Sequence, residues 1–539
     1  MRRKLAFLLC LVMALSVGLT TLGGSAEQSD YDRLINTTYT MDWYWVCMGQ
    51  DYYPDWDMVN EEFNRILHED YGATGLTVNN IGLDWNDYGV KLNAMLMSGE
   101  KVDLLHPASW TVNPEMAIPQ GMFVAWDDYM HLVPGFYEMW EPYFKYMTET
   151  GPEPLYEKKF WRIPIMKEFA SQFGLIFNRT VCEELGILEE MRAVKTPADL
   201  EKLMDVYIAA YPPDQYVCAN SANTQFMMWR ENGKEKNKIN WPVMYDADLD
   251  DYTMGFESAE WAEYMAQMRR WQEKGYNSPL LNTVQFNDLE NYGFFVGYGW
   301  VKPGGDVENN FSNAERRGYE VEYMAIGDII MERAGLIGNS MAVPRTSQNP
   351  EASMFVFQLV CMDPVLTNLL NYGIEGYHYT RDNEYMQMER TEEGANYWVD
   401  LWYMGNRNLC YRRPGETQDI GPLYQAMNAA AIVLGNDGFI FPGNILWPDG
   451  KEYDRSQYDA EMWNIDAQYM NSMATGIMTD AQFEEFKQKC YDSGFGEFLE
   501  ISKIYYAMYK DCRDSDRLAE WPDAYLKSVG YPVSDIEAE

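Results

Sequence analysis

The chain of 539 residues has very little histidine and lacks the short motifs of many enzyme active sites. Its four histidines are far apart and form no HExxH pair, so zinc catalysis and histidine-assisted nucleophilic catalysis find no support. No GxSxG sequence and no Walker loop occurs. We therefore expect no catalytic residue, no metal and no cofactor, and hence no enzyme. A two-carboxylate glycosidase stays open as an alternative, because the chain contains 83 Asp and Glu residues.

Basic residues are also scarce, with 42 Lys and Arg against 83 Asp and Glu, which gives a net charge of −41. A polyanion of this kind is repelled by phosphate backbones and by anionic lipid surfaces. The sequence therefore predicts no nucleic-acid partner, and it favours a neutral or cationic ligand.

Long apolar runs are absent except at the N-terminus, where Arg2, Arg3 and Lys4 precede an apolar stretch over residues 5–19. Small residues at 24–26 follow as a cleavage site, so residues 1–26 are predicted to be a secretory signal peptide. The only early cysteine, Cys10, stands inside the apolar stretch without small residues before it, and therefore gives no clear lipid-attachment motif. We expect an extracytoplasmic protein, secreted or associated with the cell surface.

Cysteine pairs of the CxxC type are missing too. Beyond the expected cleavage site the cysteines are scattered and odd in number, which argues against a full disulfide framework. They are Cys47, Cys182, Cys218, Cys361, Cys410, Cys490 and Cys512.

Aromatic residues, by contrast, are plentiful: they make up 15% of the chain, with 18 Trp and 40 Tyr. These side chains combine a flat stacking surface with a polar group, which suits the apolar faces of sugar rings. The alternative is that most of them fill the core of a large α/β protein.

The N-terminal part of the expected mature chain alternates between strand and helix patterns. The expected order is strand, helix, strand, helix, strand, over residues 38–46, 58–70, 76–81, 87–97 and 102–106. This order predicts parallel βαβ units. Later, Thr196 followed by Pro197 predicts a capped helix start, and residues 293–300 read as a buried strand. No internal repeat and no low-complexity linker interrupts the chain.

A run between Ser347 and Tyr379 carries the most specific pattern. Asn349-Pro350-Glu351 predicts a helix start. In the sequence NYGIEGYHY, Gly373 and Gly376 bracket Glu375, so one carboxylate is held in a tight turn among aromatic residues. Such a group suits sugar hydroxyls, although a structural turn whose Glu caps a neighbouring element explains the pattern equally well.

With NPEA, MDP, NLL and YGIEGYHY in place, this run resembles the large family-1 extracellular solute-binding proteins of bacterial ABC importers. More narrowly, it is similar to their long, lipoprotein-type branch in Clostridia and Bacilli. The stretch SGEKVDLL at 98–105 also matches a pattern of that family.

The resemblance implies an α/β, two-lobed, periplasmic-binding-protein-like (type II) fold with discontinuous lobes and a hinge. Lobe 1 is expected over 36–163 and 335–385, lobe 2 over 164–334 and 386–515, and a C-terminal tail over 516–539. The implied function is capture of a small solute, expected to be an oligosaccharide, by closure of the lobes, with ABC permease subunits as membrane partners. A monomer is expected.

Ligands of open α/β sheets bind beyond the carboxyl ends of strands, so residues that follow the expected strands are candidates. The signature run and the stretch 401–408, which is similar to a W-G-N element of the family, add further positions. The candidate ligand-binding residues are Asp51, Tyr52, Trp110, Gln225, Trp229, Trp300, Glu375, Tyr377, Tyr379, Trp402, Asn406 and Asn408. For each tryptophan, packing in the core is the alternative interpretation.

Asp246, Asp248, Asp250 and Glu257 mimic the spacing of a calcium loop. The sixth position is Asp251, where the sharp turn of such a loop requires glycine, and the pattern also suits a strand that runs into a helix at Ser258. We therefore predict no metal here. A second functional class also remains: a secreted or surface carbohydrate-interaction protein that works without a transporter.

Overall fold

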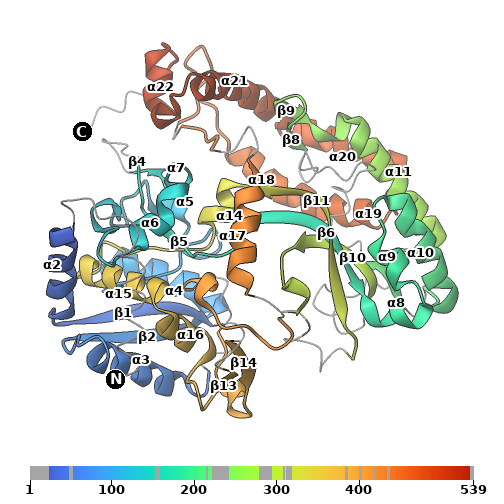
Figure 1. Cartoon of the computed structure of the whole chain (residues 1–539). Coiled ribbons are helices and arrows are strands. Elements are labelled where there is room, and N and C mark those ends of the chain that lie inside the picture. Colours follow the sequence, from blue (N-terminus) through green and yellow to red (C-terminus); the bar gives the residue numbers. More distant parts are fainter. Residues whose placement is uncertain are drawn as a thin grey trace. The chain divides into compact units, whose positions relative to one another are not determined.

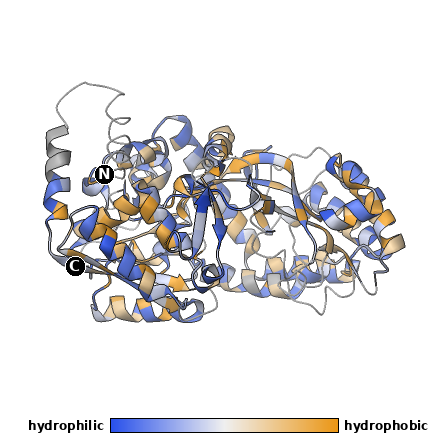
Figure 2. Cartoon of the chain, turned by 60° about the horizontal axis from the view of Figure 1, so that its bottom comes forward, coloured by the Kyte–Doolittle hydropathy of each residue, from blue (hydrophilic) through white to orange (hydrophobic). Residues whose placement is uncertain are grey.

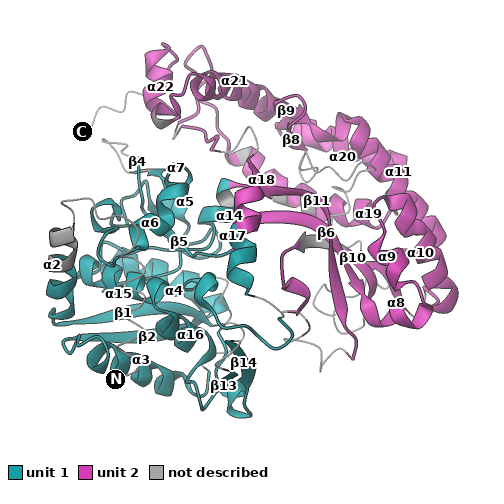
Figure 3. Ribbon diagram, viewed as in Figure 1, with its two compact units in different colours: residues 1–167, 333–425 teal, residues 168–332, 426–539 magenta. Residues whose placement is uncertain are grey.

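The chain forms two compact units, each built from two separate stretches of sequence (Figure 3). Unit 1 comprises residues 1–167 and 333–425, and unit 2 comprises 168–332 and 426–539. The computed structural model describes residues 24–47, 53–151, 158–213, 216–220, 242–277, 294–307, 310, 318–382, 386–399, 404–416, 419–433, 438–442 and 444–533. Both units mix helices with strands (Figure 1), so the predicted α/β fold with two discontinuous lobes is confirmed.

Unit 1 is organised around a mixed sheet. Strand β1 (Tyr39–Cys47) pairs in parallel with β2 (Leu76–Asp84), in register from Tyr39 opposite Leu76 to Cys47 opposite Asp84. On the other side of β1, Trp43 forms a parallel bridge to Leu104. The next segment is antiparallel: Leu105 bridges Ala342, and β12 (Ser340–Met341) pairs with β5 (Ile163–Pro164). Segment 340–342, where the chain has come back from unit 2, thus lies between Leu105 and β5 and runs antiparallel to both.

Helices α15 and α16 fill the centre of unit 1. The side chain of Asn349 caps α15 (Pro350–Met362) by accepting from the N–H of Ala352, as the Asn-Pro-Glu pattern predicted. Residues 352–361 of this helix are all buried. No single helix of the described residues is long and apolar enough to span a membrane; α15 and α16 (Pro364–Tyr372) pass that test only together, across a 90° bend. Their burial marks them as core helices.

The remaining elements of unit 1 are short apart from α2, α3, α4 and α17. They are α2 (Gly24–Ile35), α3 (Trp56–Glu69), α4 (Trp85–Ser98), α5 (Pro114–Ala117), η1 (Asp127–Tyr129), α6 (Phe136–Trp140), η2 (Glu141–Tyr143), α7 (Phe144–Met147), β3 (Glu149–Thr150), β4 (Lys158–Lys159), α14 (Arg333–Ile337), β13 (Tyr379–Asp382), β14 (Gln387–Arg390), η6 (Glu393–Asn396), η8 (Arg407–Leu409) and α17 (Ile420–Ala430), which carries the chain into unit 2.

Unit 2 contains a five-stranded sheet in the order β15-β11-β6-β10-β7. These strands are β6 (Ala170–Asn178), β7 (Val217–Asn220), β10 (Phe294–Val301), β11 (Val321–Met331) and β15 (Ile432–Val433). Strand β6 runs antiparallel to both β10 and β11, whereas β10 is parallel to β7 and β11 is parallel to β15. Four strands therefore share one direction around a reversed central strand.

Helices and a hairpin surround this sheet. They are α8 (Arg179–Leu185), α9 (Leu188–Arg192), α10 (Pro197–Ala210), β8 (Val243–Asp246), β9 (Asp251–Met254), η4 (Gly255–Glu257), α11 (Ala259–Lys274), α18 (Ser456–Ile465), η9 (Asp466–Met470), α19 (Asn471–Ala474), α20 (Asp480–Asp492), α21 (Phe495–Asp514), η10 (Leu518–Glu520) and α22 (Asp523–Ser528). The predicted cap of α10 is present, because Thr196 accepts from the N–H of Asp199.

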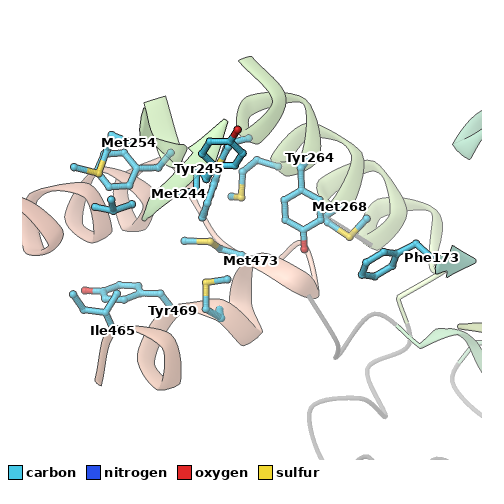
Figure 4. Close-up of a cluster of buried hydrophobic side chains, with 14 of the residues drawn as sticks. Phe173, Met244, Tyr245, Met254, Tyr264, Met268, Ile465, Tyr469 and Met473 are labelled. Atoms are coloured by element: carbon cyan, nitrogen blue, oxygen red, sulfur yellow. The ribbon is translucent and has the colours of Figure 1, made fainter. Parts of the chain in front are cut away.

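The core of unit 2 is rich in methionine and aromatic side chains (Figure 4). Met244 from β8, Tyr264 and Met268 from α11, and Met473 from α19 belong to one buried cluster. Methionine adapts its shape to irregular gaps between rings, which suits a core assembled from distant stretches of sequence. Along the helices of both units, hydrophilic and hydrophobic residues are interspersed (Figure 2), as expected where one face of a helix is buried.

Two boundaries differ from the sequence-based expectation. Residues 386–425 were assigned to lobe 2, but they lie in unit 1. There β14 pairs with β13, and the side chain of Asn368 donates to the carbonyl of Leu409 and accepts from the N–H of Tyr411. Residues 516–539 were expected to form a tail, yet Trp521 and Tyr525 are buried in the core of unit 2.

The expected signal peptide falls mostly outside the described residues, because the structure begins at residue 24. Helix α2 starts there and docks onto α15 of the same unit. Leu34 is buried, and Arg33 forms an ion pair with Glu351. The rings of Tyr31 and Phe355 meet edge to face, with their centroids 5.4 Å apart. The part of this helix after the expected cleavage site is thus held on unit 1.

Candidate functional site

The carboxyl edge of the unit 1 sheet brings several loops together. Strands β1 and β2 end in register at Cys47 and Asp84, so their carboxyl ends lie side by side at one edge of the sheet. The parallel bridge from Trp43 to Leu104 places the segment after Leu105 at the same edge. We call this region the unit 1 carboxyl edge; ligands of α/β sheets bind at such edges.

Two stacked tryptophans stand at this edge. Trp85 directly follows β2, and Trp110 belongs to the loop after Leu105. Their ring centroids are 4.0 Å apart with planes inclined by 9°, and the two residues remain 38% and 42% exposed. Trp110 was a sequence candidate. Trp85 was missed, although the rule that selected residues after strands finds it once β2 is seen to end at Asp84.

The loop 373–379 after α16 is shaped by its glycines. Gly373 has φ +84°, and a Cβ atom on it would lie 2.5 Å from Nδ1 of His378. Gly376 has φ +87° in open space, and its N–H donates to the carbonyl of Tyr379 at 2.6 Å. The two sharp turns expected around Glu375 are therefore present.

His378 connects this loop to the segment after β1. Its Nδ1 accepts from the backbone N–H of Ile374 at 2.9 Å, so in the neutral ring the proton must reside on Nε2, which faces Oδ2 of Asp55 at 3.2 Å. Burial lowers the pKa of His378, and the attraction of Asp55 only partly offsets this. In addition, the N–H of Asp55 donates to the backbone carbonyl of Asn396, and the ring centroids of Tyr53 and Tyr397 are 5.7 Å apart.

Glu375 and its aromatic neighbours have different exposures. The Glu375 carboxylate is 43% exposed and pairs with Arg381 at 3.2 Å, and the Arg381 guanidinium lies 4.4 Å above the ring of Tyr411. Tyr377 is 38% exposed, whereas Tyr379 is buried, and burial raises its pKa. Glu375 and Tyr377 are thus accessible from solvent, and Tyr379 is part of a small core with Tyr372 and Met388.

Asn406 and Asn408 are held inside unit 1. The amide of Asn406 donates to the carbonyl of Cys361 at 2.9 Å, and its oxygen accepts from the N–H of Asn408 as the cap of η8. Asn406 is buried, and the side-chain oxygen of Asn408 is buried without a hydrogen-bond partner among the described residues. These contacts give Asn406 a structural role in joining η8 to α15.

The other sequence candidates cannot be assigned to this surface. Asp51, Tyr52, Gln225, Trp229 and Trp402 lie outside the described residues. Trp300 pairs with Phe173 through the backbone of β10 in unit 2, but its side chain is outside the described part.

The corresponding edge of the unit 2 sheet is stabilised by polar contacts. The side-chain oxygen of Asn428 accepts from the N–H groups of Phe169 and Ala170 at 2.7 and 3.0 Å, just where β6 begins. Lys302, at the end of β10, pairs with Glu168 at 3.3 Å. The start of β6 is thus fixed beside the end of β10.

The calcium-like spacing belongs to a hairpin. Residues 246–251 connect β8 to β9, and Asp246 accepts from the N–H groups of Asp248 and Leu249. Asp250 pairs with Arg513 at 3.0 Å, and Glu257 contacts the hydroxyl of Tyr491. These carboxylates are used for turn and core contacts, and the described residues contain no cluster of three or more His, Cys, Asp or Glu side chains that could hold a metal ion.

The seven cysteines beyond the expected signal peptide are all free thiols, six of them buried and Cys410 partly so. Burial raises the pKa of Cys182 to about 12, that of Cys490 to about 12 and that of Cys410 to about 11. Such thiols stay protonated at neutral pH and are poor nucleophiles.

Comparisons with known proteins define the fold. No protein-family model matches the chain. It is 23% identical over 420 residues, 76% of this chain and 80% of the relative, to a carbohydrate ABC transporter substrate-binding protein of Streptococcus pneumoniae serotype 4 (strain ATCC BAA-334 / TIGR4). It is also similar to the crystal structure of the N-glycan transport solute-binding protein NgtS of Streptococcus pneumoniae, with a TM-score of 0.72 and 20% identity, covering 88% of this chain and 99% of that one.

A third similar structure is the S. pneumoniae ABC-transporter substrate-binding protein FusA in complex with kestose, with a TM-score of 0.56 and 13% identity over 88% of this chain and 100% of FusA. The chain therefore has the two-domain fold of solute-binding proteins. The likeness to this class that the signature run predicted is confirmed, while its assignment to a branch of Clostridia and Bacilli stays a prediction.

Proposed function

We propose that this chain is the extracytoplasmic solute-binding component of a bacterial ABC importer and that it captures an oligosaccharide. The observation that carries the proposal is the likeness to NgtS over 88% of this chain and 99% of that protein, because it extends through both units. The similar proteins of known structure include sugar complexes: NgtS was solved with Man5GlcNAc and FusA with kestose.

The surface of unit 1 supports a sugar ligand. Trp85, Trp110 and Tyr377 offer exposed ring area, and the Glu375 carboxylate offers hydrogen-bond acceptors to hydroxyl groups. Rings and carboxylates of this kind bind polyols by stacking and by charge-assisted hydrogen bonds.

Binding without conversion is part of the proposal. Glu375 is the exposed carboxylate of the signature loop, and it forms an ion pair with Arg381 at 3.2 Å. A glycosidase needs a second carboxyl group acting as general acid across the scissile bond. An ion-paired acceptor suits recognition of hydroxyl groups better than proton transfer to a leaving group.

We further propose that the protein is exported and that it works with a membrane transporter. The signal-peptide pattern at residues 1–26 supports export, and the net charge of −41 disfavours nucleic acid as a partner. ABC permease subunits in the membrane are the proposed macromolecular partner of a monomeric chain. We further propose that solute stabilises a closed arrangement of the two units, by binding it more tightly than the open one.

A thermal-shift screen of the chain without residues 1–26, against oligosaccharides, peptides and polyamines, tests this function. We expect an oligosaccharide to raise the melting temperature, as any ligand that binds only the folded state must, and to be recovered intact. Recovery of fragments would indicate a glycosidase. If no oligosaccharide shifts the transition, the importer proposal is contradicted.

The role of Glu375 is tested by the Glu375→Ala substitution. We expect oligosaccharide affinity to fall about tenfold or more, which corresponds to roughly 1.4 kcal/mol, with little change in melting temperature, because the carboxylate is 43% exposed. The matched control is Glu389→Ala, which removes an exposed carboxylate from the neighbouring β14. A collapse of the melting temperature in Glu375→Ala alone would show that this carboxylate is structural.

A further inference from the structure

The stacked pair Trp85 and Trp110 differs from the other tryptophans described in unit 1. Trp43, Trp45, Trp56, Trp126, Trp140 and Trp161 are buried, and Trp398 is only partly exposed. Trp85 and Trp110, by contrast, keep 38% and 42% of their surface exposed while stacking on each other at 4.0 Å. Exposing two indoles forgoes hydrophobic stabilisation that burial provides elsewhere in the same unit, at about 25 cal/mol for each Å² of apolar surface. Exposed aromatic pairs are characteristic of binding surfaces.

The backbone holds both indoles in place. Trp85 is the first residue of α4, and Asp84 caps this helix by accepting from the N–H of Asn86. The loop of Trp110 is fixed by Thr111, whose hydroxyl donates to the backbone carbonyl of His106 and accepts from the N–H of Ala108. The platform is therefore fixed before any ligand arrives, which reduces the entropic cost of binding.

Helix α4 and the Trp110 loop are also fastened to each other. Asn93 of α4 donates its amide to the carbonyl of Thr111 at 3.2 Å. The backbones approach so closely at Gly89 that an added Cβ would lie 3.1 Å from Cα of Thr111. The distance between the two rings is thus set by backbone packing, with Gly89 as the residue that permits it.

We propose that Trp85 and Trp110 form a rigid aromatic platform on which one ring of a neutral pyranosyl oligosaccharide stacks. This inference rests on the proposed function and names the ligand class. Because the two rings stack face to face, the pair presents the flat outer face of an indole. This face complements the continuous C–H face of a gluco- or galacto-configured pyranose. A five-membered furanose ring offers no such face.

The charges around the platform favour an uncharged sugar. Asp84 and Asp87 lie within three residues of Trp85 on the same helix turn, and Asp87 is paired with Lys91 at 2.8 Å. The whole chain carries a net charge of −41. A uronate would be repelled by this field, whereas the hydroxyl groups of a neutral sugar can donate to these carboxylates.

The test uses the full chain after residue 26, labelled with 5-fluorotryptophan, with the ¹⁹F resonances of the two rings assigned from Trp85→Phe and Trp110→Phe. The probe is a mannose and N-acetylglucosamine oligosaccharide; an oligomer built only of fructofuranose units and an oligouronate serve as comparison ligands. We expect the pyranosyl probe to shift both assigned resonances and the other two ligands to leave them unchanged.

Calorimetric titration of alanine variants provides the second readout. Trp85→Ala and Trp110→Ala are each expected to weaken binding of the pyranosyl probe at least tenfold, and the phenylalanine variants less. The matched control is Tyr137→Ala, which removes a ring that is 43% exposed elsewhere on unit 1 and is expected to change affinity less than twofold. If an alanine variant does not fold, the ¹⁹F shifts of the native chain decide.

The outcomes separate this inference from the proposed function. If the probe binds while both resonances stay fixed and the alanine variants bind as the native chain does, the platform is overturned and the importer function stands. If the oligomer of fructofuranose units or the oligouronate shifts the resonances instead, the assignment to neutral pyranosides is overturned. If none of the three ligands binds, the proposed oligosaccharide function itself fails.

Discussion

At the scale of single residues, the two glycines around Glu375 have nearly the same φ angle but different surroundings. Both have φ near +85°, yet a side chain on Gly373 would collide with the buried ring of His378, whereas nothing lies within 4 Å of a Cβ on Gly376. This contrast shows that Gly373 serves packing as well as backbone conformation.

Substituting each glycine by alanine measures that contrast. Gly376→Ala is expected to lower the free energy of unfolding by about 1 kcal/mol, the cost of a left-handed conformation for a residue with a Cβ. Gly373→Ala is expected to cost about 3 kcal/mol or more, because His378 must also move. Equal losses in urea unfolding of the two variants would show that the contact with His378 is not rigid.

The buried histidine His106 predicts a pH dependence of stability. Burial lowers its pKa to about 4, below the unfolded value near 6.5, and its Nδ1 is 2.9 Å from the carbonyl of Ser340. Below pH 6.5 the unfolded state binds the proton more readily, so this contribution to stability is complete above pH 6.5 and is lost as the pH falls toward 4. The loss amounts to about 3 kcal/mol.

His106→Asn separates this effect from the titration of other groups, because the amide can keep the donor to Ser340 and does not titrate. We expect the unfolding free energy of the variant to fall less steeply than that of the native chain between pH 6.5 and 4. Parallel pH profiles for the two proteins would contradict the assignment.

At the scale of elements, Asp363 connects two helices of unit 1. It is the single residue between α15 and α16, and its side chain accepts from the N–H groups of Val365 and Leu366 as the cap of α16. It also accepts from the hydroxyl of Tyr71, which follows α3. One carboxylate thus fixes the bend between the core helices and their contact with the neighbouring segment.

Asp363→Ala is expected to lower the free energy of unfolding by about 2 kcal/mol, since it removes a cap and leaves the Tyr71 hydroxyl without this acceptor. Asp363→Asn keeps a capping oxygen and should cost roughly half as much. The midpoint of urea unfolding distinguishes the two variants. A midpoint for Asp363→Ala equal to that of the native chain would show that water replaces these bonds without loss.

Elements with a local cause could be predicted from the sequence. The cap at Thr196, the helix start at Asn349-Pro350 and the strand that became β1 follow from short-range hydrogen bonding and alternation, and all are present. The exposure of the candidates near Glu375 could not be predicted from the sequence, because it depends on distant partners. Tyr377 and Tyr379 are two residues apart, yet only Tyr379 is buried, in a core completed by Tyr411.

At the scale of the whole molecule, the division into units depends on contacts that no local pattern encodes. The chain crosses between units at 167/168, 332/333 and 425/426, whereas the last crossing was expected near 385. The β13–β14 hairpin and the hydrogen bonds of Asn368 retain residues 386–425 in unit 1. Trp85 was missed for a related reason: its importance depends on the stacking partner Trp110, which lies 25 positions further along the chain.

The central claim is that this chain binds an oligosaccharide and releases it unchanged. Its most direct test is a calorimetric titration of the chain without residues 1–26 with a mannose and N-acetylglucosamine oligosaccharide, followed by mass spectrometry of the recovered sugar. We expect saturable binding with a negative heat-capacity change from ring stacking and full recovery of the intact ligand. Cleaved sugar, or no binding across a panel of oligosaccharides, would contradict it.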